Sequence, residues 1–114
     1  MCQSNEMDKK LEQIPKIVKE VIHQIDEAAE VILFGSRARG DFDADSDWDF
    51  LILIDEEVTS EKEELIRDAL YDIELASGEV ITSIIEEKSE WDKYGETLIY
   101  KNIEEQGILV SSTS

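Results

Sequence analysis

The apolar residues in the first part of the chain recur at steps of three and four, which places them on one face of an amphipathic helix. They are Met7, Leu11, Ile14, Val18, Val21 and Ile25. Pro15 falls inside this pattern, and a proline within a helix removes a backbone hydrogen bond. We therefore expect either a helix that begins at Pro15 or a short helix followed by a second one.

Three apolar runs predict strands. The run at 31–34 is wholly apolar and is ended by Gly35, as in a strand buried on both faces. The run at 47–54 is rich in aromatic and branched residues and predicts a second central strand. The run at 80–85 predicts a third strand, with residues 86–88 as its exit into a loop.

A second long helix is predicted between Ser60 and Gly78. Ser60 and Glu63 fit a capping box, and Gly78 suits the end of the helix. The apolar stripe of this helix consists of Leu65, Ala69, Ile73 and Ala76. Further along the chain, Ser89 and Thr97 predict the N-caps of two short helices.

The predicted order of helix, strand, strand, helix, strand, helix indicates an α/β (α+β) fold, a small mixed β-sheet with helices packed on it. The 114 residues suffice for one hydrophobic core, so we expect a single domain over 1–114. Residues 1–6 and 111–114 are expected to fray.

Acidic side chains dominate the charge of the chain, 29 against 11 basic ones, for a formal net charge of −18. Such a charge repels phosphate backbones and anionic lipids, so we expect neither nucleic acid nor a membrane as a direct partner. A solvated surface accounts for most of the acidity, and a basic partner protein is the alternative. One cysteine and no long apolar run predict a cytoplasmic protein.

Aspartates stand at every second position from 41 to 49. Asp41, Asp43 and Asp45 match the start of a calcium-binding EF-hand, but that loop needs glycine and glutamate where Ser46 and Ile52 stand. An EF-hand is therefore excluded. These three aspartates lie in a loop, and we expect water to solvate them.

Asp47 and Asp49 differ from the loop aspartates because they begin a predicted strand, where alternate side chains share a face. The opposite face then carries Trp48, Phe50, Ile52 and Ile54, while Leu51 and Leu53 continue the aspartate face into the core. Two carboxylates held side by side repel each other. The sequence therefore predicts a divalent cation, magnesium or manganese, at this pair.

The loop from Gly35 to Gly40 has chemistry that complements the aspartates. Glycine lets the backbone approach a phosphate, Ser36 offers a hydroxyl and an amide, and Arg37 and Arg39 can neutralise phosphate oxygens. The loop matches neither the P-loop nor the dinucleotide fingerprint GxGxxG.

Gly35 and Ser36, ten intervening residues and Asp47-Trp48-Asp49 together form a GS-x10-DxD pattern between two predicted strands. This pattern resembles the signature of the DNA-polymerase-beta-like nucleotidyltransferases. The chain is most similar to the minimal nucleotidyltransferase (MNT) domains, and the resemblance covers nearly all of it in element order. It implies the nucleotidyltransferase fold.

The family resemblance also implies roles for these residues. Gly35 and Ser36 would bind the β- and γ-phosphates of ATP, and the nearby arginines would assist. Asp47 and Asp49 would be catalytic and would hold two Mg²⁺ (or Mn²⁺) ions. The implied reaction transfers AMP to a hydroxyl group.

A third carboxylate usually comes from a later strand in this family, and the aligned position here is Thr82. A threonine cannot act as a carboxylate ligand or base. Glu79 and Glu86 flank the predicted strand, and either could substitute in a different register.

Two functions follow from the resemblance. As an enzyme, the chain would resemble the MNT antitoxins, which pair with a helical HEPN toxin and transfer AMP from ATP to a tyrosine on it. As a binding module, it would bind a nucleotide and neutralise its partner by contact, without turnover. Aminoglycoside nucleotidyltransferases share the signature but carry further substrate-binding segments. A true carboxylate within metal reach of Asp47 and Asp49 would distinguish the enzyme from the binding module.

Overall fold

The computed structural model describes residues 6–40 and 46–110, with side chains from residue 13 onward. The elements are α1 (Glu6–Ile25), β1 (Glu30–Phe34), α2 (Ser36–Arg39), β2 (Trp48–Ile54), α3 (Ser60–Ser77), β3 (Ile81–Glu87), α4 (Lys88–Trp91), a 3-10 turn η1 (Asp92–Tyr94), α5 (Leu98–Gln106) and β4 (Ile108–Leu109). Of the segments expected to fray, residues 1–5 and 111–114 lie outside this description, and Glu6 is the first residue of α1.

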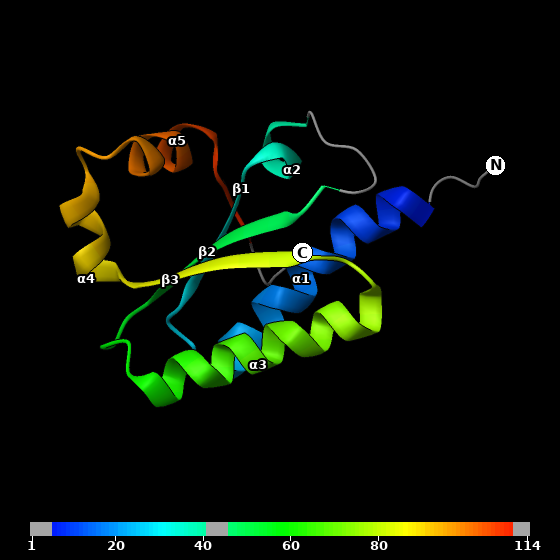
Figure 1. Ribbon diagram of the computed structural model, residues 1–114, viewed down its shortest axis with the longest axis horizontal. Helices are drawn as coiled ribbons and strands as arrows, with labels where there is room; N and C mark the ends of the chain where they lie inside the picture. The colour runs from blue at the N-terminus through cyan, green and yellow to red at the C-terminus, as the bar shows by residue number, and fades with distance from the viewer. Residues whose placement is uncertain (1–5, 41–45, 111–114) are drawn as a thin grey trace.

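Within the described residues, the sheet has four strands in the order β3-β2-β1-β4. Figure 1 shows β3, β2 and β1 side by side. β1 pairs antiparallel with β2 and with β4, whereas β2 and β3 run parallel and are joined through α3. The sheet is therefore mixed, and the predicted fold class is confirmed. β4, which the sequence did not predict, adds an edge strand of two residues.

Helices cover both faces of the sheet, and β2 supplies the core of each. Trp48, Phe50, Ile52 and Ile54 face α1 and α3, where they pack with Ile22 and other buried residues. Leu51 and Leu53 face the opposite side, in a smaller cluster with Trp91 and Ile103. This alternation confirms the predicted faces of the strand.

α1 is continuous through Pro15, so both predicted alternatives, a helix that begins at Pro15 and two successive helices, are wrong. Proline removes one hydrogen bond of the helix, but residues on either side of it pack on the core. Ile14 and Val18 are buried against the sheet, and this burial outweighs the loss of the single bond.

α3 begins one residue earlier than the predicted capping box implies, because Thr59 accepts a hydrogen bond from the Lys62 amide. Gly78 ends the helix in the left-handed conformation, as predicted (φ 77°). The buried face, however, consists of Ile66, Leu70 and Ile73. Leu65, which the apolar stripe placed inside, is 57 % exposed.

β3 extends to Glu87 and leads directly into α4, so the predicted loop at 86–88 is wrong. The strand is longer because it pairs with the whole of β2, as far as Ile54 opposite Glu87. Ser89 lies inside α4 and is not its N-cap. Thr97 caps α5 as predicted, because its side chain accepts a hydrogen bond from the Tyr100 amide at 3.3 Å.

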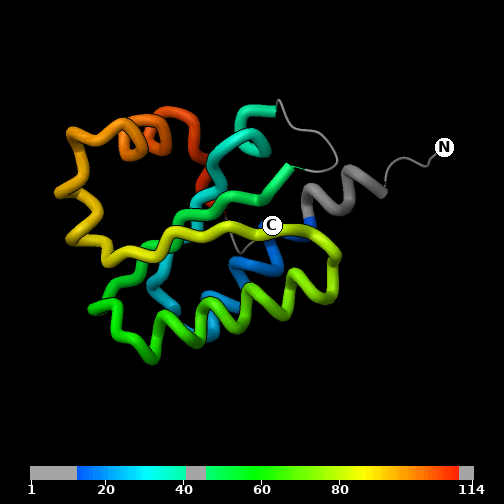
Figure 2. The backbone as a smooth tube through the Cα atoms, in the orientation of Figure 1, coloured from blue at the N-terminus to red at the C-terminus, as the bar shows by residue number. Residues whose placement is uncertain are grey.

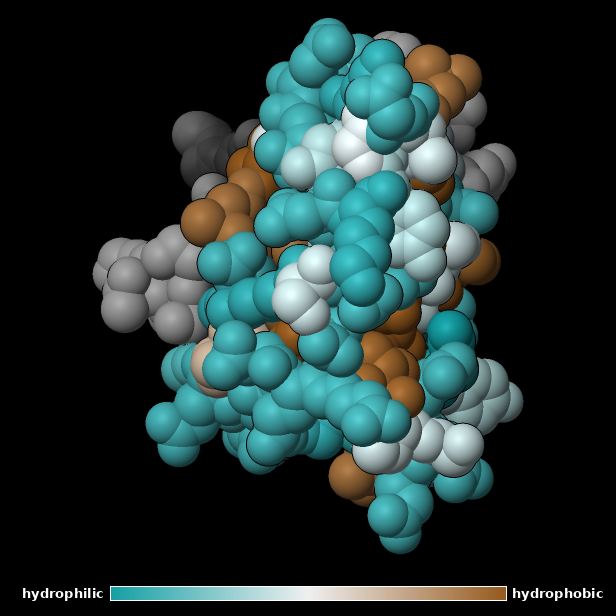
Figure 3. Space-filling model, turned by 90° about the vertical axis from the view of Figure 1, so that its left-hand side faces the viewer, coloured by the Kyte–Doolittle hydropathy of each residue, from teal (hydrophilic) through white to brown (hydrophobic). Residues whose placement is uncertain are grey.

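Hydrophilic residues cover much of the face shown in Figure 3, with apolar surface exposed between them. Within residues 6–40 and 46–110, no helix combines the length and the apolar character that a membrane span requires.

Candidate functional site

The end of β1, the short helix α2 and the start of β2 meet at one end of the central strands (Figure 2). Phe34 is the antiparallel partner of Asp49, so the residue after Phe34 lies beside this aspartate. That residue is Gly35, with a positive φ of 76°. A β-carbon at Gly35 would overlap the carboxylate of Asp49. Glycine is therefore required for both its conformation and its size.

Asp49 is half-buried on the face of β2 that also carries Leu51 and Leu53. Burial raises the pKa of its carboxyl group, the charge of Asp47 raises this pKa further, and the charge of Arg39 lowers it. Asp47 is exposed just before the strand. The two carboxylates thus lie close enough to repel each other, and a cation between them would relieve both penalties.

Arg37 lies behind the site, on the opposite face of β2 from Asp49. Its side chain is 5 % exposed, and its Nη2 and Nε donate to the Ser46 carbonyl at 2.9 and 3.3 Å. The guanidinium stacks on Trp48, 4.3 Å from the ring centroid. Glu79 lies 3.4 Å from this guanidinium and accepts a hydrogen bond from Trp48 Nε1 at 3.0 Å. These contacts tie α2 to the residues at the start of β2.

The sequence did not predict that Arg37, Trp48 and Glu79 contact one another. Arg37 was assigned to phosphate, Trp48 to the core and Glu79 to a possible third carboxylate. The signal that was present is weak, an arginine and a glutamate that each flank a strand. Only the tertiary contacts of α2 with the residues before β3 and at the start of β2 show that the three side chains meet.

Arg39 remains on the site side of α2, and Ser36 begins this helix. Arg39 is exposed, and its charge acts on Asp49. Ser36 is half-buried at the first position of α2, directly after Gly35. The structure therefore brings together Gly35, Ser36, Arg39, Asp47 and Asp49.

Thr82 is the direct neighbour of Asp49 in the parallel register of β2 and β3. Glu86 pairs with Leu53, four residues further along, or about 13 Å at the rise of a strand. Glu79 is occupied with Trp48 and Arg37 on the other face. Neither glutamate supplies a third carboxylate beside Asp49.

Among the described residues, no group of three or more His, Cys, Asp or Glu side chains is placed to hold a metal ion. Asp41, Asp43 and Asp45, expected to be solvated, lie outside the described residues. In the register of β2 and β3, the residue beside Asp49 on the neighbouring strand is therefore a threonine, Thr82, and not a third carboxylate.

A pocket of about 440 Å³ opens next to Gly35 and Arg39. Phe34, the cross-strand neighbour of Asp49, forms one wall, and α5 forms the other. The α5 residues are Leu98, Ile99, Asn102, Ile103 and Gln106. This pocket is largely apolar with two carboxamides, a composition common in small-molecule sites.

Comparison with known proteins agrees with this geometry. The family profile described as "Nucleotidyltransferase domain" matches residues 11–110. The chain belongs to the nucleotidyltransferase domain family. The family membership predicted from the sequence is therefore confirmed.

Two curated relatives of this nucleotidyltransferase domain are named as protein adenylyltransferases. A candidate protein adenylyltransferase of Methanocaldococcus jannaschii is 46 % identical over 63 residues, which cover 50 % of this chain and 64 % of the relative. Protein adenylyltransferase MntA of Aphanizomenon flos-aquae is 63 % identical over 27 residues, 24 % of this chain and 18 % of the relative. The chain thus spans less than two thirds of the length of these relatives.

Solved structures share the fold. One is described as a toxin-antitoxin with AMP-PNP, with a TM-score of 0.63, 14 % identity and coverage of 89 % of this chain and 75 % of that one. Another is a candidate nucleotidyltransferase from Sulfolobus solfataricus, with a TM-score of 0.56, 20 % identity and coverage of 96 % and 89 %.

Proposed function

We propose that the chain is a Mg²⁺-dependent nucleotidyltransferase that binds ATP and transfers AMP to a hydroxyl group of a partner protein. The observation that carries the proposal is the contact between Gly35 and Asp49. This contact places the backbone of Gly35, which can approach a phosphate, next to the carboxylate of Asp49, which can bind a cation. Membership of the nucleotidyltransferase family supports the reaction class.

Gly35 and Ser36 would bind the terminal phosphates, with Arg39 contributing positive charge from the same side. Arg37, which the sequence also assigned to phosphate, contacts Ser46 and Trp48 instead. We therefore propose that Arg37 positions the loop and that Arg39 faces the nucleotide.

Asp47 and Asp49 fit a magnesium site in their chemistry. They offer oxygen ligands, and the raised pKa of Asp49 reflects burial and a neighbouring negative charge that a cation would offset. Two carboxylates with phosphate oxygens are a common donor set for Mg²⁺, and Mn²⁺ accepts the same ligands. When bound, the ions would neutralise the triphosphate and favour attack at the α-phosphorus.

The pocket between Phe34 and α5 suits the adenosine part of ATP. It begins at Gly35 and Arg39, so a nucleotide whose phosphates lie at the loop can extend into it. Apolar walls favour a stacked base, and the carboxamides of Asn102 and Gln106 can both donate and accept hydrogen bonds.

The proposed acceptor is a tyrosine of a helical, HEPN-type toxin. The name MntA and the toxin-antitoxin neighbour, similar in fold, support a toxin as the partner. The cytoplasmic location stays a prediction.

Thr82 favours a second candidate function, that of a nucleotide-binding subunit that neutralises its partner by contact. Beside Asp49 a threonine provides neither a charged metal ligand nor a base. Nucleotide binding would then persist without turnover.

One experiment separates the two candidates. The protein is incubated with ATP labelled at the α-phosphate, Mg²⁺ and, as the candidate toxin, the product of the adjacent reading frame, with Asp47→Asn/Asp49→Asn as the control. Transfer of label to the toxin by the wild type alone supports the enzyme. A stable complex without label contradicts the enzymatic function and supports the binding subunit.

A further inference from the structure

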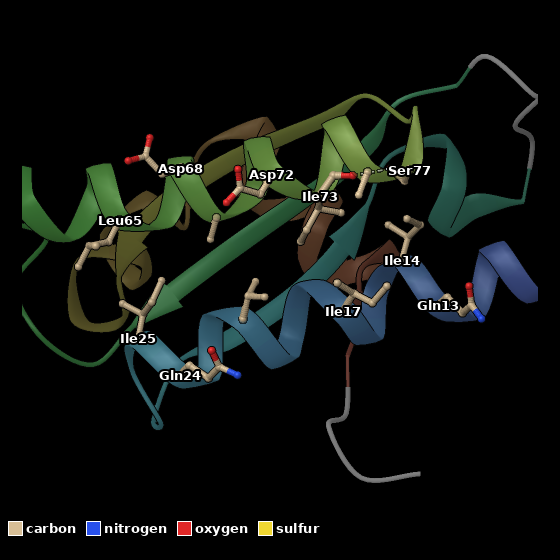
Figure 4. Close-up of a pocket in the computed structure, with 13 residues that line it drawn as sticks. Gln13, Ile14, Ile17, Gln24, Ile25, Leu65, Asp68, Asp72, Ile73 and Ser77 are labelled. Atoms are coloured by element: carbon tan, nitrogen blue, oxygen red, sulfur yellow. Dashed lines mark hydrogen bonds between the residues drawn. The ribbon is translucent and has the colours of Figure 1, made fainter.

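α1 and α3 lie side by side on the face of the sheet that carries Trp48, and a groove runs between them (Figure 4). Its volume is about 730 Å³. The apolar residues that line it are Ile14, Ile17, Val21, Ile25, Leu65, Ala69, Ile73 and Ala76. We call this feature the α1/α3 groove.

The walls of the α1/α3 groove expose large apolar side chains to solvent. Leu65 is 57 % exposed and Ile17 is 38 % exposed, from opposite sides of the groove. Ala69 and Ala76 lie on the α3 side, where their small side chains leave the groove open. Such a groove between two helices can accept the ridge of side chains of a third helix.

Carboxylates flank the α1/α3 groove on both sides. On the α3 side, a hollow lined by Glu61, Glu64, Leu65 and Asp68 shares its last two residues with the groove. On the α1 side, a hollow lined by Glu20, His23, Gln24 and Glu27 shares Gln24 with it. Asp68 and Asp72 stand at the rim itself, as Figure 4 shows. The groove is therefore an apolar channel with acidic borders.

We propose that the α1/α3 groove docks an amphipathic helix of another protein, whose apolar face carries lysine or arginine on both flanks. The apolar ridge would fill the groove, and the basic side chains would reach the two acidic hollows. A second copy of this chain is a poor occupant, because it would bring the same acidic borders and a formal charge of −18 against the groove.

The docking surface lies on the opposite face of the sheet from the nucleotide site. The groove covers the side of β2 that holds Phe50, whereas Asp49 shares its face with Leu51. A helix in the groove therefore leaves Gly35 and Asp49 accessible. The docking proposal thus goes beyond the proposed transferase function and does not depend on it.

The probe for the test is a designed helical peptide of about 18 residues, roughly 27 Å long, with leucine on one face and lysine on both flanks. A matched peptide keeps the leucines and replaces the lysines by glutamate. Both carry a fluorescent label, and binding is followed by anisotropy at near-physiological salt, where weak surface attraction is screened. We expect saturable one-to-one binding of the lysine peptide alone.

Variants locate the binding surface. Ile17→Ser/Leu65→Ser removes exposed apolar contacts, with Leu75→Ser as control, because Leu75 is 67 % exposed on the same helix outside the groove. Asp68→Asn/Asp72→Asn neutralises the rim, and Glu104→Asn/Glu105→Asn makes the same charge change on α5. We expect each groove variant to weaken binding about tenfold and each control to leave it unchanged.

Three results overturn the docking proposal. The first is that the lysine peptide does not bind, and the second is that groove and control variants lose peptide affinity equally. The third is self-association of the protein that Leu65→Ser abolishes, because this would identify a second copy as the occupant of the groove. Asp47→Asn/Asp49→Asn is expected to bind the peptide like the wild type. This variant separates a failure of the docking surface from a failure of the nucleotide site.

Discussion

Thr82 and Asp49 are direct neighbours in the parallel ladder of β2 and β3, and their side chains project from the same face of the sheet. A hydroxyl group therefore occupies the place where a carboxylate would complete the proposed metal site. The family resemblance assigned the third carboxylate to the position of Thr82, and the register of the two strands places Thr82 beside Asp49.

Thr82→Asp is expected to bind Mn²⁺ about tenfold more tightly in the presence of ATP, since it adds a third carboxylate to the pair. Titration calorimetry measures this affinity. Ser83→Asp is the matched control, because it adds the same charge to the opposite face of β3, where Ser83 contacts Arg67. An equal gain in both variants would show that net charge, and not the position beside Asp49, controls the affinity.

Gly35→Ala is expected to lose both stability and nucleotide binding. A β-carbon at this position has a strained positive φ, which costs about 1–3 kcal/mol, and it also overlaps the Asp49 carboxylate. Gly40→Ala is the control, with a φ of 88° but no atom of the described residues within 4 Å of its β-carbon. Urea denaturation should find that the positive φ lowers the free energy of unfolding of both variants. ATP titration should find a loss of ATP affinity only in Gly35→Ala.

Asp49→Asn is expected to raise the thermal stability of the metal-free protein at neutral pH. Burial and Asp47 raise the pKa of Asp49 in the folded state, so its ionised form opposes folding. This penalty is present above the folded-state pKa and disappears as the pH falls through it toward the ordinary value of 3.8. The variant's advantage in Tm should therefore shrink in acid.

The metal dependence of Tm completes the Asp49 test. Mg²⁺ should stabilise the wild type at neutral pH and have little effect on Asp49→Asn, because the ion offsets the charge of the carboxylate pair. Equal Tm values for the two proteins in chelator at neutral pH would contradict the destabilising role of Asp49.

Trp48→Phe is expected to destabilise the fold by about 1–3 kcal/mol more than Trp91→Phe. Both indoles are buried, but Trp48 Nε1 donates to Glu79 and its ring stacks under Arg37. Trp91 Nε1 has no hydrogen-bond partner in the described part of the chain. Chemical denaturation measures the difference, and equal losses would mean that the contacts behind the site add little stability.

Local patterns predicted the parts of the molecule that depend on neighbouring residues. The period of two in β2 gave the correct faces for Trp48 and Leu51. Thr97 caps the start of its helix and Gly78 caps the end of its helix, as expected. The pattern from Gly35 to Asp49 lies between two strands, as expected, and Gly35 and Asp49 are close neighbours at one end of the sheet. Alternation, capping and loop length act within a few residues, so the sequence alone determined them.

Contacts between distant segments were decided only by the tertiary structure. Pro15 stays inside α1 because the helix packs on the sheet, and Leu65 is exposed because α3 turns Ile66 and Leu70 inward. The register of β3 brings Thr82 to Asp49 and Glu79 to Trp48. Register and helix rotation minimise the exposed apolar area of the whole fold, a sum over residues far apart in the chain, which no local pattern contains.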